Sequence, residues 1–227
     1  MKLPARPFQG TYAMLRRLWS SAIQSGSAHT RLRRITGFSV DRRRIYSVGG
    51  ILPLSLKDPC SKERPLVYRT DEWVTHDEIQ AFLETAMPDG MSRHGWDYMT
   101  AVQDYVLHQP NQQHYIRNLP QIEIVCELVR RSHFPNLPSR LQSYFAFLKK
   151  EEAVKFSRNQ PPQEKPLGIY ELSSDKALIA DQEWLKLGYS PAMSWLMAYK
   201  YWSGAVSKTP IFEVILGPPV KVIRRIE

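Results

Sequence analysis

The residues with the clearest chemical potential lie in three short segments that set a charged or hydroxyl side chain among apolar neighbours. The first is Leu66-Val-Tyr-Arg69, the second runs from Pro138-Ser-Arg140 to Phe147, and the third covers residues 210–223. The run Ile211-Phe-Glu-Val-Ile-Leu216 has the composition of a strand. Glu213 on this strand is the foremost candidate for a catalytic residue.

Common catalytic and phosphate-binding motifs are missing from the sequence. It has no G-x-x-x-x-G-K-[ST] loop, no G-x-G-x-x-G, no H-E-x-x-H and no G-x-S-x-G. The six histidines lack a metal-ligand spacing, and the two cysteines form no C-x-x-C pair. These absences argue against P-loop, Rossmann, zinc-protease and serine-hydrolase chemistry, and we expect no metal cofactor.

The elements that must position these residues suggest an α+β fold. Periodicity and turn chemistry predict helices over 79–87, 92–108, 120–132, 150–156, 182–187 and 191–202. Strands are predicted over 44–48, 65–69, 144–147, 168–172, 211–216 and 220–223, the last two as a hairpin-like pair. Helices thus cluster in the first half and strands in the second, an order that favours α+β over a doubly wound sheet.

The first 44 residues are predicted to be an extension of the main domain. Residues 8–24 have the pattern of an amphipathic helix, and Ser25-Gly-Ser-Ala28 then breaks it. This helix could dock on the core or serve a membrane surface or secretion. The remaining residues, 45–227, are long enough for one ordinary domain.

The chain carries a net charge of +9, and residues 31–44 are rich in arginine. Such a surplus favours acidic partners such as nucleic acid or phosphorylated cofactors, although a solvated basic surface fits equally well. We expect no integral membrane association, because no apolar window approaches the length of a membrane span. Two isolated cysteines fit a reducing, cytoplasmic compartment.

In the order and spacing of the three segments, the sequence resembles the ADP-ribosyltransferase superfamily. The resemblance rests on a strand ending in Arg, a later strand followed by a helix with Ala153 and Phe156, and the final Glu213-Val-Ile-Leu-Gly-Pro-Pro-Val. It is closest to a poorly characterised bacterial branch with Pro138-Ser-Arg and Tyr201-Trp-Ser-Gly motifs. It covers roughly residues 44–227 and implies the family's split β-sandwich, which binds NAD between two small sheets.

For catalysis, the resemblance implies roles for Glu213, Ser139 and Tyr144. Glu213 would stabilise the positive charge that develops on the ribose as nicotinamide leaves. Ser139 would orient Glu213 or contact the nicotinamide ribose. Tyr144 would offer its ring to the nicotinamide. Glu213 could instead be a solvent-facing strand position, and Tyr144 a core residue.

For NAD binding, the resemblance implies Tyr68, Arg69 and Arg140. A guanidinium fork suits the pyrophosphate, so Arg69 and Arg140 are the candidate cations. Tyr68 is a second aromatic candidate for the nicotinamide. NAD would be consumed as a substrate, with no metal involved.

The sequence departs from the arginine-modifying members of the superfamily at two points. It lacks their Ser-Thr-Ser motif, and Ile211 stands where many members have Glu or Gln. The expected acceptor of ADP-ribose is therefore a macromolecule, nucleic acid or protein, rather than arginine specifically. The resemblance implies a bacterial toxin, a secreted effector delivered into a target cell or a phage-defence factor, with a neutralising partner protein as a further partner. The alternative is a non-enzymatic module that binds nucleic acid through residues 31–44.

Overall fold

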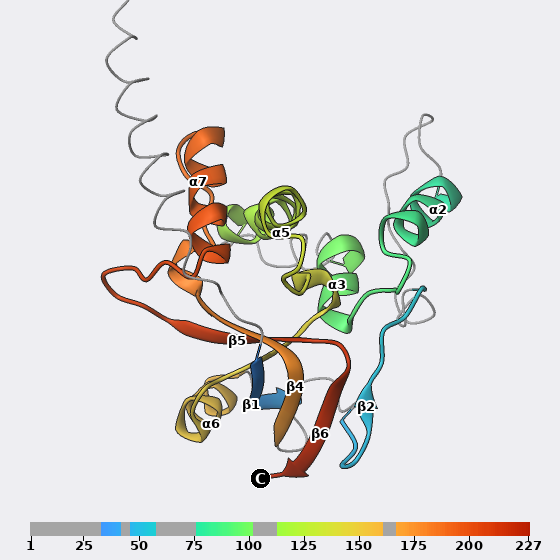
Figure 1. The fold of residues 1–227 in the computed structure, drawn as a ribbon, viewed down its shortest axis with the longest axis vertical. Coiled ribbons are helices and arrows are strands. Elements are labelled where there is room, and N and C mark those ends of the chain that lie inside the picture. Colours follow the sequence, from blue (N-terminus) through green and yellow to red (C-terminus); the bar gives the residue numbers. More distant parts are fainter. Residues whose placement is uncertain (1–32, 42–45, 58–75, 102–112, 161–166) are drawn as a thin grey trace, which may run out of the picture. The chain divides into compact units, whose positions relative to one another are not determined.

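The computed structural model describes residues 33–41, 46–57, 76–101, 113–160 and 167–227. They belong to one compact unit, Leu32–Glu227. Its helices are α2 (His76–Ala86), α3 (Arg93–Trp96), the π-helix η1 (Asp97–Ala101), α5 (Gln113–His133), the 3₁₀ helix η3 (Arg140–Gln142), α6 (Lys150–Arg158), the 3₁₀ helix η4 (Gln182–Trp184) and α7 (Pro191–Trp202). Its strands are β1 (Arg33–Asp41), β2 (Ile51–Leu52), β3 (Tyr144–Ala146), β4 (Gly168–Asp181), β5 (Phe212–Gly217) and β6 (Val220–Arg225). Helices and an antiparallel sheet together make the fold α+β, as the sequence predicted (Figure 1).

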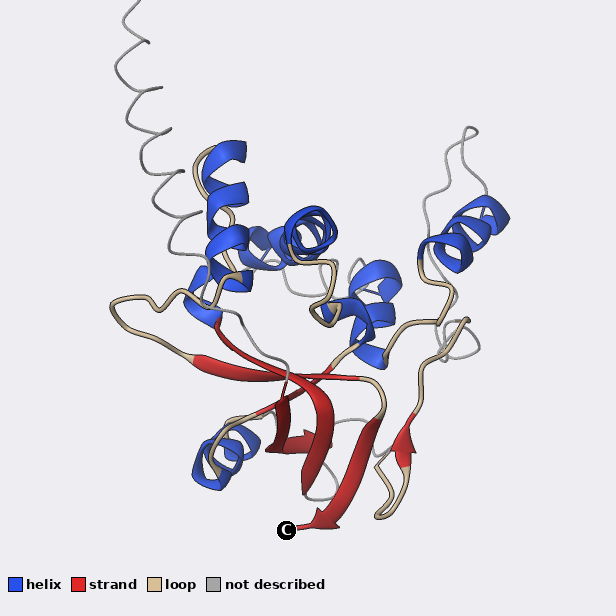
Figure 2. Ribbon diagram, in the orientation of Figure 1, coloured by secondary structure: helices blue, strands red, loops and turns tan. Residues whose placement is uncertain are grey.

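The long strand β4 organises the sheet. One of its edges pairs with β1 through Gly168–Ser174 and Ala177. It also pairs with β6 through Tyr170–Ser173 and with β5 through Lys176–Asp181. The path of the sheet is β2-β6-β4-β5-β3, with β1 joined to β4 beside it. The strands are drawn red in Figure 2.

A short bridge ties β1 to the end of β3 and so closes the strands β1, β4, β5 and β3 into a ring. Phe38 and Phe147 exchange two backbone hydrogen bonds, of 2.9 and 2.8 Å. Gly37 makes this approach feasible, because a Cβ there would lie 2.7 Å from the Cβ of Ala146. Closure of this kind removes an exposed strand edge.

The pairing register decides which side chains share a face of the sheet. Opposite residues in an antiparallel pair point the same way, so Glu213 shares its face with Ala180, and Ile215 shares the same face with Leu178 and Phe145. This face packs against α5 and α7 in one hydrophobic cluster. The opposite face carries Val214 and Leu216 into a second cluster, and α6 packs against β1 (Figure 1).

Several elements differ from the sequence-based expectation. The expected hairpin between 211–216 and 220–223 is wrong: β5 and β6 each pair with β4, and Gly217-Pro-Pro219 carries the chain onward instead of turning it back. β4 runs nine residues beyond its predicted end at 172, because Ser173, Ser174 and Lys176 in its polar centre pair with neighbouring strands. The predicted strand at 44–48 falls partly outside the described residues, and Tyr46 and Ser47 have no regular structure.

The main domain also begins earlier in the chain than the sequence predicted. β1 lies within the segment expected to be an extension, yet it pairs along β4 and Val40 is buried beneath α6. The predicted amphipathic helix at 8–24 and the predicted strand at 65–69 lie outside the described residues. Over the part of the chain that the structure describes, no helix is long and apolar enough to span a membrane.

Candidate functional site

Helix α5 brings two carboxyl groups to the interior, one turn apart. Its apolar face, with Ile122, Cys126 and Val129, packs on α7 and the sheet. Glu123 and Glu127 lie beside this face and are almost fully buried. Carboxyl groups are rarely buried without partners, so both require hydrogen-bond donors from another segment.

Glu127 anchors the segment that carries Pro138-Ser-Arg140. Its Oε2 accepts hydrogen bonds from the Ser139 hydroxyl (2.9 Å) and from Nε of Arg130 (2.9 Å). Arg131 donates to Oε1 at 2.7 Å. Burial alone would raise the pKa of Glu127, but these donors outweigh it and lower the pKa below its usual value. Ser139 also accepts a hydrogen bond from the Leu141 backbone and so begins η3.

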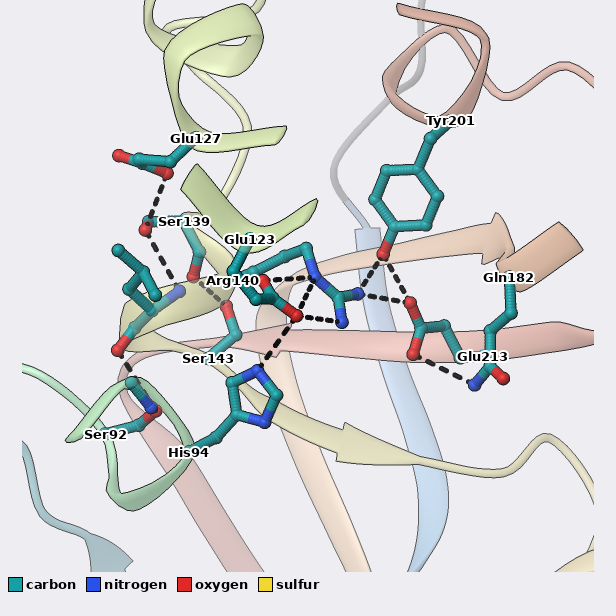
Figure 3. Close-up of polar contacts among 12 residues, drawn as sticks. Ser92, His94, Glu123, Glu127, Ser139, Arg140, Ser143, Gln182, Tyr201 and Glu213 are labelled. Carbon is teal, nitrogen blue, oxygen red and sulfur yellow. Dashed lines mark hydrogen bonds and ion pairs between the residues drawn. The ribbon is translucent and has the colours of Figure 1, made fainter. Parts of the chain in front are cut away.

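Arg140 at the start of η3 connects α5 to β5 and α7 (Figure 3). Its Nε and Nη2 donate to the two oxygens of Glu123, both at 2.9 Å, as a fork. Its Nη1 donates to Oε1 of Glu213 and to the hydroxyl of Tyr201. The guanidinium lies over the Phe145 ring, 4.6 Å from its centroid. Arg140 is only 5% exposed, so these contacts are made in a weakly screened environment.

Glu213, also 5% exposed, uses its two carboxylate oxygens differently. Oε1 accepts from both Arg140 and Tyr201. Oε2 accepts from the side-chain amide of Gln182 at 3.0 Å, where β4 passes into η4 (Figure 3). One oxygen is thus held by charged and phenolic donors from the interior, and the other faces a half-buried neutral amide.

The charged groups of this cluster shift one another's pKa values. Burial would raise the pKa of Glu123, but the charge of Arg140 and hydrogen bonds from His94 and Arg140 hold that pKa far below its usual value. Burial would lower the pKa of Arg140, and the charges of Glu123 and Glu213 raise it instead. Burial and the neighbouring Glu213 raise the pKa of Tyr201 well above normal, so Tyr201 acts as a neutral donor.

His94 is the outermost member of the cluster. Its Nε2 lies 3.3 Å from Oε1 of Glu123, and its ring packs between those of Tyr98 and Phe145 at 4.4 and 4.5 Å. Its side chain is one-fifth exposed. His94 therefore lies between Glu123 and the solvent-exposed side of the cluster.

The structure brings together three of the residues expected from the sequence, Ser139, Arg140 and Glu213, with contacts that differ from expectation. Ser139 bonds to Glu127 and not to Glu213. Arg140 was expected to bind pyrophosphate, but its guanidinium is buried and bonded to Glu123, Glu213 and Tyr201. Its observed contacts are those of a residue that positions Glu213.

Tyr144 does not join this cluster. It pairs with Leu216, so the sheet's alternation places it on the face opposite Glu213. Its hydroxyl donates to the Pro53 carbonyl, and burial raises the pKa of Tyr144. Tyr144 and Glu213, which were expected to act on the same nicotinamide riboside, thus lie on opposite faces of the sheet. Tyr68 and Arg69 lie outside the described residues.

Sequence reasoning missed Glu123, Tyr201, Gln182 and His94. A signal existed for Glu123: a carboxylate next to the apolar stripe of α5, repeated four residues later at Glu127, indicates buried partners. Tyr201 belongs to the Tyr-Trp motif, but the motif alone indicates no role for its hydroxyl. Gln182 has no distinguishing sequence pattern.

Two further observations bear on function. Among the residues that the structure describes, no group of three or more His, Cys, Asp or Glu side chains could hold a metal ion. A family model described as "Protein of unknown function (DUF2441)" matches residues 63–227. No curated protein matches the chain.

Proposed function

Because the chain belongs to the DUF2441 family, whose description gives no function, we propose from the site itself that the protein is a NAD-dependent ADP-ribosyltransferase. The acceptor in this proposal is a macromolecule, nucleic acid or protein. The setting that fits is that of a bacterial toxin, an effector or a phage-defence factor.

One observation carries the proposal: two of the motifs on which the resemblance rests converge on Glu213. Arg140 from Pro-Ser-Arg and Tyr201 from Tyr-Trp-x-Gly donate to the same oxygen of Glu213. These residues are 73 and 12 positions from Glu213 in the chain. Motifs that were separate in the sequence therefore serve one carboxylate.

The proposed reaction breaks the bond between the ribose C1′ and the nicotinamide nitrogen, and nicotinamide leaves with the electron pair. Positive charge develops on the ribose, and a nearby carboxylate stabilises it. A nucleophilic oxygen or nitrogen of the acceptor then bonds to C1′ and loses its proton to water. Glu213 would act through Oε2, since Oε1 is held by Arg140 and Tyr201.

The different roles proposed for Arg140 and Arg69 follow from the burial of Arg140. Arg140 positions Glu213 and is not offered to the pyrophosphate, because its donors already have partners. Binding of the pyrophosphate and of the nicotinamide ring is proposed for Arg69 and Tyr68.

The test is NAD consumption by the full chain with labelled NAD and a cell lysate as the source of acceptor. We expect Glu213→Gln to lower turnover by about 10²–10³-fold, because the amide keeps the shape but not the charge. Glu171→Gln is the matched control: this glutamate pairs with Arg224 elsewhere in the sheet and should leave turnover unchanged.

Two results would contradict the proposal. One is a folded wild-type protein that consumes no NAD with any acceptor mixture. The other is Glu213→Gln with wild-type turnover. If nucleic-acid binding that weakens steeply with salt accompanied the first result, the non-enzymatic binding module would be favoured instead.

A further inference from the structure

We propose that Glu123 is a positioning residue for Glu213, acting through the arginine that the two carboxylates share. The inference rests on the proposed function, in which Glu213 is the working carboxylate. Glu123 touches neither Glu213 nor any expected substrate position; its contacts are with Arg140 and His94.

The contacts between Glu123 and Arg140 determine how the guanidinium is oriented. Glu123 occupies one whole edge of the guanidinium, with contacts from Nε and Nη2 at 2.9 Å each. Because a guanidinium is planar and rigid, fixing this edge fixes the direction of Nη1. The rings of Phe145 and Tyr201, 4.6 and 5.3 Å from the guanidinium carbon, restrict its tilt.

The direction of Nη1 decides which oxygen of Glu213 remains available. A single nitrogen reaches Oε1 only, so Oε2 is left to Gln182. Without Glu123, Arg140 is free to turn and present two nitrogens to Glu213, the bidentate arrangement that carboxylates favour. Oε2 would then be bonded to the arginine and less able to stabilise positive charge on the ribose.

Formal charge leads to a second, independent expectation. Among the residues that the structure describes, Arg140 is the one cation that bonds to both Glu123 and Glu213. Replacing either carboxylate by an amide leaves one balanced ion pair in the interior. Replacing both leaves a buried arginine with no carboxylate partner, which is strongly destabilising. The two losses of stability must therefore be more than additive.

Turnover measures the positioning role. We expect Glu123→Gln to lower kcat by about 10²-fold, the effect of a misplaced catalytic group. KM should stay nearly unchanged, since Glu123 has no part in binding NAD. A merely structural role would instead lower the amount of folded enzyme and leave kcat per folded molecule unchanged; that result, in an active wild-type protein, would overturn the proposal.

Thermal unfolding tests the shared arginine without any need for turnover. The set is the wild type, Glu123→Gln, Glu213→Gln and their double variant. We expect the double variant to lose more in Tm than the sum of the two single losses. A double variant that fails to fold, while both single variants fold, is the same result in extreme form.

Glu171→Gln provides the control for unfolding. Glu171 lies on β4 and its partner is Arg224, so it shares no partner with Glu213. Its loss should add to that of Glu213→Gln within error. Additive losses for Glu123 and Glu213 would overturn the inference. A wild type that consumes no NAD would instead defeat the proposed function, and the unfolding result would still decide whether the arginine is shared.

Discussion

At the scale of residues, Arg140 serves three partners because a guanidinium presents donors along two edges of one plane. Glu123 takes one edge, and Glu213 and Tyr201 share a nitrogen on the other side. A lysine ammonium in this position could not hold two directions at fixed angles. The residue type, and not only its charge, therefore determines how Glu213 is presented.

The depressed pKa of Glu123 predicts how stability depends on pH. A carboxyl whose pKa is lower in the folded state contributes stability above its unfolded value, about 4.5, and loses it as the pH falls further. The advantage of the wild type over Glu123→Gln should thus shrink below this pH, by up to about 1.4 kcal/mol per pH unit. Chemical denaturation of both proteins across the acidic range measures it.

The comparison isolates Glu123 because Glu127, whose pKa is also lowered, titrates in both proteins. A stability difference that stays constant from neutral to strongly acidic pH would show that Glu123 gains nothing from its contacts with Arg140 and His94.

At the scale of elements, the turn that carries Arg140 is held by α3 as well as by α5. The Leu141 carbonyl accepts hydrogen bonds from the backbone and the hydroxyl of Ser92, at 3.0 and 3.1 Å. Ser92 also caps α3 by accepting from the Gly95 backbone at 3.2 Å. The position of η3 is thus determined by two helices, α5 just before it in the chain and α3 much earlier.

Gly95 provides the closest contact of this arrangement. A Cβ at this position would lie 2.0 Å from the Leu141 carbonyl oxygen, so α3 or η3 would have to move. We expect Gly95→Ala to destabilise the protein by about 1–3 kcal/mol, the usual cost of overpacking. The same shift would displace Arg140 and lower NAD turnover. Chemical denaturation and turnover assays on one preparation measure both effects.

The comparison variant is Gly49→Ala, where a Cβ would meet no neighbour but the backbone has a φ of +81°. It should lose stability through backbone strain alone and keep its turnover. If Gly95→Ala left both stability and turnover at wild-type values, η3 would not depend on its contact with α3.

Elements with strong local signals could be predicted from the sequence. Helix α7 begins with Pro191 in its first turn and ends just before Gly204, as expected, and the strands at 144–147 and 211–216 lie close to β3 and β5. β4 could not be predicted in full, because Ser173-Ser-Asp-Lys176 looks like a turn locally. Its hydrogen-bond partners lie on strands far away in the sequence. The Ser174 hydroxyl, for example, donates to the Gly217 carbonyl.

At the scale of the whole molecule, the candidate site was predictable in part. Short motifs identified Ser139, Arg140 and Glu213, but their contacts depend on tertiary packing. Glu123 and Gln182 reach the site only because α5 and β4 converge there. Tyr144 was misplaced because one position of strand register exchanges the two faces of a sheet, and the register is not encoded locally.

The last prediction concerns where the domain begins. β1 pairs with β4 from Asp41 to Arg33, and its bridge at Phe38 closes the ring of strands. Deleting residues 1–31 removes none of these contacts, so the shortened protein should unfold cooperatively with nearly the wild-type Tm. Deleting residues 1–44 removes β1, exposes Ala153 and Ile169 where Val40 covered them, and opens an edge of β4. That variant should lack cooperative unfolding and aggregate, since unpaired edges and exposed core favour association. Equal Tm values for the two deletions would place the boundary after residue 44 and make β1 dispensable.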